Sequence, residues 1–111
     1  MTIDDIAARL EALGHPTRLR IFRTLVRVGD PGLPVGQLQE RIEIAPSTLS
    51  HHLAKLLTVG LVEQERRGTT LICRANFDAM RALVGSLADE CCIEQTTGCS
   101  TEPDAPRRIA S

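Results

Sequence analysis

The chain has 111 residues, a formal net charge of −1 and 42% hydrophobic residues, with two Phe and neither Trp nor Tyr. This composition favours one compact domain with an aliphatic core between packed helices. It excludes a globally positive field, so any nucleic-acid binding must come from a local patch, doubled by dimerisation. No apolar run approaches the length of a membrane span and residues 1–10 lack a signal-peptide pattern, so we expect a cytoplasmic protein.

Two helices are expected at the N-terminal end. Thr2, followed by two aspartates, predicts a helix start, and an apolar stripe continues from there to Gly14. His15-Pro16 is a break, after which a second helix is predicted over residues 17–27. Its basic residues share the side opposite its apolar stripe, and we expect that side to be solvated rather than bound to DNA: Arg20, Arg23 and Arg27.

A helix-turn-helix is expected in the middle of the chain. After a turn-rich loop at 29–34, a short helix over 35–42 is joined by residues 43–45 to a second helix that starts at Pro46 and ends near Gly60. Leucines form the apolar stripe of this second helix. Its opposite face carries the residues that we predict to contact DNA, namely Ser47, Thr48, Ser50, His51 and Lys55. An ordinary amphipathic surface helix is the alternative interpretation of the helix alone. His51 and His52 are adjacent, so we expect one to contact DNA and the other to pack inward.

A β-hairpin follows. The period changes to about two after Gly60, which predicts strands over 61–66 and 71–75 around a tight turn at Gly68. Arg66 and Arg67 lie near the tip, where they are expected to hold DNA phosphate. Residues 44–76 contain four Lys or Arg and two Glu, a local charge of +2. The alternative is a hairpin that caps the core with solvated arginines.

A last helix is predicted from Phe77, capped by Asn76, to about Cys92. The first and last helices carry more apolar surface than a small domain can bury, which indicates a dimer interface. The predicted fold class is therefore mainly α with a β-hairpin wing, a homodimeric winged helix-turn-helix. Residues 1–92 form the DNA-binding and dimerisation domain, and residues 93–111 form a flexible tail that carries Cys99.

Three of the four cysteines lie close to the C-terminus: Cys91, Cys92 and Cys99. Thiols stay reduced in the cytoplasm, so they indicate metal or redox chemistry rather than disulfides. Three thiolates without an evident fourth ligand suit a soft, three-coordinate ion, arsenite or antimonite, better than structural zinc. In the alternative interpretation Cys91 and Cys92 are small buried hydrophobic residues. Cys73, within a predicted strand, is expected to pack in the core.

Three segments resemble the ArsR/SmtB family of winged-helix metalloregulatory repressors: residues 10–25, residues 46–76 and the cysteine-bearing end of the last helix. The resemblance implies a homodimer that represses an operon and releases DNA on binding a metal or metalloid. Some family members sense arsenic through a cysteine pair and a third cysteine at this end of the chain. The Cys-x-Cys pair that many members carry near the recognition helix is absent from residues 35–42, and residues 77–90 lack the histidine of zinc-binding members.

The function predicted is a repressor that binds double-stranded operator DNA and is released by arsenite at Cys91, Cys92 and Cys99, with no organic cofactor and no membrane partner. A thiol redox switch, or a cadmium- or lead-responsive repressor of the same fold, is the first alternative. A thiol metal buffer that never binds DNA is the second. An enzyme is not expected, because the sequence shows no paired carboxylates, nucleophile–base pair or phosphate loop.

Overall fold

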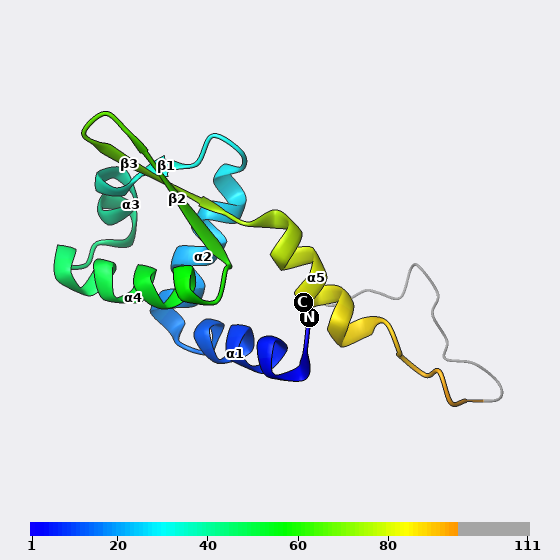
Figure 1. Ribbon diagram of the computed structural model, residues 1–111. Helices are drawn as coiled ribbons and strands as arrows, with labels where there is room; N and C mark the ends of the chain where they lie inside the picture. Colours follow the sequence, from blue (N-terminus) through cyan, green and yellow to red (C-terminus); the bar gives the residue numbers. More distant parts are fainter. Residues whose placement is uncertain (96–111) are drawn as a thin grey trace.

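The computed structural model describes residues 1–95, which form five helices and three strands (Figure 1). In chain order the elements are α1 (Ile3–Leu13), α2 (Pro16–Val28), β1 (Leu33–Pro34), α3 (Val35–Ile42), α4 (Pro46–Thr58), β2 (Val62–Arg67), β3 (Thr70–Ala75) and α5 (Phe77–Ala88). The predicted winged helix-turn-helix is confirmed. None of the helices in residues 1–95 combines the length and apolar character needed to cross a bilayer.

Local capping explains where the helices begin. The Thr2 hydroxyl accepts a hydrogen bond from the Asp5 amide and the Asp5 carboxylate accepts one from the Thr2 amide, a reciprocal capping box at the start of α1. Asn76 Oδ1 accepts a hydrogen bond from the Ala79 amide and starts α5, as predicted. At the start of α2 the cap is His15, whose Nδ1 accepts a hydrogen bond from the Thr17 amide.

The three strands form one antiparallel sheet in the order β1-β3-β2. The hairpin pairs Val62 with Ala75 and Arg67 with Thr70, so its turn is shorter than predicted. Strand β1 was not predicted, because its two residues lie in a loop rich in turn residues. Gly32, at φ +70°, brings this loop against β3, where a Cβ would collide with the Cys73 carbonyl oxygen.

The core lies between α2, α3, α4 and the sheet. Its fully or almost fully buried members are aliphatic, as expected from the scarcity of aromatic residues: Ile21, Leu25, Leu38, Ile42, Leu49, Leu53, Leu56, Leu61 and Val62. Cys73 is completely buried among them, where Gln64 Nε2 lies 3.4 Å from its sulfur. Burial raises the pKa of the Cys73 thiol, which keeps the thiol protonated.

Helix α5 ends at Ala88, four residues before the predicted end near Cys92. Asp89 and Glu90 follow directly, and acidic side chains at the negative end of a helix dipole disfavour its continuation. Residues 89–94 form turns, and Cys92 adopts a left-handed backbone at φ 60°. In Figure 1, α5 extends away from the sheet and its far part lies beside the N-terminal end of α1.

Candidate DNA-binding surface and thiol pair

Helix α4 has one buried face and one exposed face. Leu49, Leu53 and Leu56 are between 0% and 3% exposed and fix the helix to the core. All five residues predicted to contact DNA from this helix are exposed: Ser47, Thr48, Ser50, His51 and Lys55. Ala45 precedes the helix and provides no side-chain cap, so the first amides of α4 stay open to an external acceptor such as a phosphate.

The turn between α3 and α4 is held by its own residues. Glu43 ends α3 in the left-handed conformation, at φ 63° and ψ 51°. Gln39 Nε2 donates a hydrogen bond of 3.2 Å to the Ile44 carbonyl, and Ile44 packs against the core. The orientation of α4 relative to α3 is thus fixed inside one subunit.

The wing carries both predicted arginines near its tip, and both are exposed. Arg67 is ion-paired to Glu65, with Nε 3.2 Å from Oε2, and Arg74 Nη1 lies 3.1 Å from Oε1 of the same carboxylate. The hydrogen bonds from these two arginines hold the pKa of Glu65 below its usual value. Within residues 1–95, Arg66 has no carboxylate partner, so it is the wing cation that is most available to phosphate.

The two adjacent histidines of α4 separate as predicted, since His51 is exposed and His52 is 7% exposed. The His52 ring lies 4.6 Å from the His15 ring, measured between centroids, and its Nδ1 lies 3.4 Å from Arg18 Nη1. Burial, then the charges of His15, Arg18 and His51, lower the pKa of His52.

Arg18 itself is buried, and its Nε donates a hydrogen bond of 2.7 Å to the Ala12 carbonyl of α1. It thereby ties the end of α1 to the inner side of α4. Sequence reasoning missed this residue. The signal was its position three and seven residues before Ile21 and Leu25, on the inward stripe of α2.

A helix-turn-helix domain family matches residues 13–65. The chain is 32% identical over 92 residues to a biofilm growth-associated repressor of Xylella fastidiosa, which covers 83% of this chain and 78% of that protein. An ArsR-like transcriptional regulator from Rhodococcus sp. RHA1 superposes with a TM-score of 0.67 at 25% identity, over 76% of each chain. The chain belongs to the ArsR/SmtB family of winged-helix transcriptional regulators. Its α4 is therefore the recognition helix, and DNA is its ligand.

ArsR/SmtB regulators of this fold are homodimers. A homodimeric winged helix-turn-helix DNA-binding domain from Mycobacterium bovis superposes with a TM-score of 0.64 at 29% identity, over 87% of this chain and 90% of that one. This chain has an exposed apolar face where α1 meets α5, which is suited to a dimer interface. Val84 and Leu87 are 61% and 63% exposed on α5, and Ile3 is 77% exposed on α1.

The predicted thiol ligands of this ArsR/SmtB chain lie beyond the end of α5. The sulfur atoms of Cys91 and Cys92 are 3.6 Å apart, with Cys91 exposed and Cys92 half-buried. Cys99 lies outside the described residues. Up to Gln95, the structure contains no group of three or more His, Cys, Asp or Glu side chains arranged to hold a metal ion. Cys91 also lines a depression between α1 and α5 together with Ile3 and Leu87, which belong to the apolar face.

Proposed function

We propose that this ArsR/SmtB regulator is a dimeric repressor that arsenite, or another soft thiophilic ion, releases from its operator by binding Cys91, Cys92 and Cys99. The observation that carries the proposal is the short distance between two sulfur atoms next to the apolar α1–α5 face. An ion about 2.3 Å from each of two sulfurs, at a tetrahedral angle, separates them by about 3.8 Å. The observed 3.6 Å is close to that separation, so the two cysteines can bind one ion once both are reduced to thiolates.

Two features of the ligand set favour a metalloid. Thiolates select soft ions, and Cys99 in the tail provides a third thiolate without a histidine or carboxylate at matching spacing. Repression itself is supported by the relative from Xylella fastidiosa, whose name describes a repressor.

Release requires that ion binding at the thiols changes the position of α4. Cys91 lines the same depression as Ile3 and Leu87, so an ion there reorders the chain next to the dimer face. A shift of α5 at that face changes the separation of the two recognition helices, which must match successive major grooves. A coupling free energy of about 1–3 kcal/mol weakens DNA binding several-fold to about a hundredfold.

The test is a titration of the reduced dimer on a fluorescent operator duplex that has been selected from a random pool. Arsenite should release the wild type, and Cys91→Ser should remain bound. Cys73→Ala is the matched control, because this thiol is buried in the core, and it should respond like the wild type. Equal release of the wild type and of Cys91→Ser would overturn the proposed ligand set.

A redox switch is the second candidate, because the sulfur atoms of Cys91 and Cys92 lie 3.6 Å apart and vicinal thiols can oxidise, with Cys99 as a third thiol in the sequence. Peroxide takes the place of arsenite in the same titration. Release by peroxide that is reversed by a dithiol reductant, with no release by arsenite under reducing conditions, identifies the redox switch. Release by cadmium or lead alone identifies a different soft ion at the same thiols.

A further inference from the structure

Four arginines from two helices converge on one depression of the surface. Arg20, Arg23 and Arg27 come from α2 and Arg41 comes from the last turn of α3. The depression has a volume of about 300 Å³, and Thr24 and Ile42 complete its lining. No carboxylate of residues 1–95 lines it, so the surface is a cationic patch in a chain whose net charge is −1.

Among residues 1–95, none of the four arginines forms an ion pair. In residues 1–95, the arginines with a carboxylate oxygen within 4.0 Å are Arg67, Arg74 and Arg81, all in the wing or in α5. Glu40 and Glu43 are neighbours of Arg41 in the sequence, yet neither pairs with the patch. Arginines at spacings of three and four on one helix repel one another, so this arrangement does not stabilise the fold by charge. The patch is therefore open to an external anion.

The patch begins beside the recognition helix. Arg20 Nη2 lies 3.4 Å from the Ile42 carbonyl, and only residues 43–45 separate Ile42 from the start of α4. Helix α2 packs against both α3 and α4 (Figure 1). From Arg20 to Arg27 the helix rises about 10 Å. The row of arginines therefore extends away from the helix-turn-helix. Its length exceeds the distance between neighbouring phosphates on one DNA strand.

We propose that Arg20, Arg23, Arg27 and Arg41 bind phosphates of the DNA duplex outside the groove occupied by α4, and so lengthen the binding site beyond the base pairs that α4 and the wing contact. Guanidinium groups match phosphate oxygens in bidentate geometry. Since phosphates are the same in every sequence, this contact adds affinity and salt dependence and no sequence preference. The inference rests on the DNA-binding function.

The experiment compares two duplexes that share one selected operator, a core duplex of about 20 base pairs and a duplex with about 10 further pairs of random sequence on each side. The wild-type dimer should bind the longer duplex roughly tenfold more tightly at low salt, with a steeper dependence of log K on log salt. Arg23→Gln/Arg27→Gln should remove this gain and reduce the salt slope by about two to four, while affinity for the core duplex stays the same.

Arg81→Gln is a control for the loss of an arginine outside the patch, because Arg81 is exposed on α5 and paired with Asp78. It should keep the full preference for the longer duplex. Thr24→Ala changes the lining of the depression without changing charge, and it should also behave as the wild type.

Two results would overturn the inference. One is equal wild-type affinity for the two duplexes. The other is an equal loss of affinity for both duplexes in Arg23→Gln/Arg27→Gln. That result would mean that the arginines attract DNA only through their overall charge. Failure of the wild type to bind either duplex would contradict the DNA-binding function itself, which separates that failure from a failure of the patch.

Discussion

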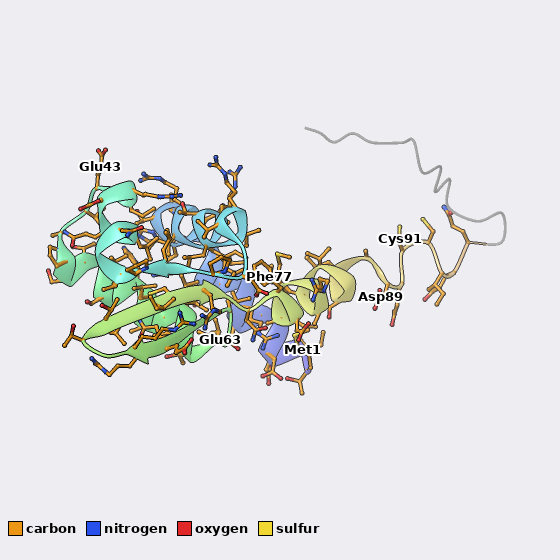
Figure 2. All side chains as sticks on the ribbon, turned by 90° about the horizontal axis from the view of Figure 1, so that it is seen from above. Met1, Glu43, Glu63, Phe77, Asp89 and Cys91 are labelled. Atoms are coloured by element: carbon orange, nitrogen blue, oxygen red, sulfur yellow. The ribbon has the colours of Figure 1, made fainter. Side chains whose placement is uncertain are left out.

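The DNA-binding end and the thiol end of this subunit are built on opposite principles. The recognition helix α4 is fixed by three buried leucines, and the turn before it is locked by a hydrogen bond from Gln39. Cys91, in contrast, lies beyond the last turn of α5, and the apolar residues beside it face outward. Figure 2 shows the labelled Cys91 and Glu43, a residue of the turn that precedes the recognition helix, toward opposite ends of the molecule.

The two regions therefore differ in how a ligand can act on them. The reading surface is preorganised by the core of a single subunit, so a ligand at the far end does not need to refold it. Apolar residues near the end of α5 are exposed in the single subunit, so a ligand there can change how two subunits pack together.

The largest effect is expected where α4 meets the core. Leu56 is fully buried, so Leu56→Ala leaves a cavity and should lower the free energy of unfolding by about 3 kcal/mol. Urea unfolding followed by circular dichroism measures this change. Leu87→Ala is the matched control at the other end. Leu87 is 63% exposed in the subunit, so its truncation should act mainly by weakening the dimer. Equal losses that do not depend on protein concentration would erase the distinction between the two ends.

The dimer face should respond to charge rather than to cavity formation. Val84→Asp places a carboxylate on the exposed apolar side of α5, and we expect the dimer dissociation constant to rise by about a hundredfold. Sedimentation velocity measures dissociation, and unchanged far-ultraviolet circular dichroism shows that the subunit remains folded. Arg81→Gln, on the same helix but ion-paired to Asp78, should leave the dimer intact. A fully dimeric Val84→Asp would place the interface elsewhere.

The sequence predicted those elements whose signals are local. Helix periodicity, the helix start at Thr2 and the hairpin turn at Gly68 depend on residues within a few positions of one another, and all are confirmed. Strand β1 was missed because two residues carry no period, and because its pairing depends on the close approach of Gly32 to Cys73, some forty residues away.

The site was predicted to a similar degree. The exposed face of α4 follows from its leucine stripe, so the predicted contacts are exposed as expected. The burial of Arg18 beside His52 was not predicted, because it depends on how α1, α2 and α4 cross. The ion pair between Glu65 and Arg74 was missed for the same kind of reason, since it joins neighbouring strands through the hairpin register. The roles of Cys91, Cys92 and Cys99 in ion binding stay predictions.

A smaller effect is expected from pH through the inner side of α4. A guanidinium only donates hydrogen bonds, so the contact between Arg18 Nη1 and His52 Nδ1 requires an unprotonated nitrogen. The pKa of His52 is below its ordinary value of 6.5, so the unfolded chain binds this proton more readily than the native one. The free energy of unfolding should therefore be highest above about pH 6.5 and should decrease as the pH falls below it.

Urea midpoints between about pH 5 and 8 measure this dependence. His52→Gln keeps an acceptor for Arg18 and removes the titration, so its pH profile should be flatter than that of the wild type. His51→Gln removes an exposed imidazole from the same helix and should keep the wild-type profile. If both variants lose stability with acid as the wild type does, another group is responsible.

The smallest effect is expected at the wing. There, the Arg67 side chain can pair either with Glu65 of the same subunit or with a DNA phosphate. The Glu65 carboxylate occupies Arg67 and Arg74, and a surface ion pair of this kind is weak. When Arg67 binds a DNA phosphate, it must either leave Glu65 or bring the negative charge of the Glu65 carboxylate close to that phosphate. Glu65→Gln removes that charge, so operator affinity should rise about threefold, with a steeper salt dependence.

Glu63→Gln is the matched control, because Glu63 lies two residues earlier on β2 and has no ion pair among residues 1–95. Fluorescence anisotropy on the core duplex measures both variants, and only Glu65→Gln should gain affinity beyond the general effect of removing one negative charge. A loss of affinity in Glu65→Gln would mean that the carboxylate holds Arg67 in its DNA-binding position. The wing would then be preorganised by the subunit in the same way as α4.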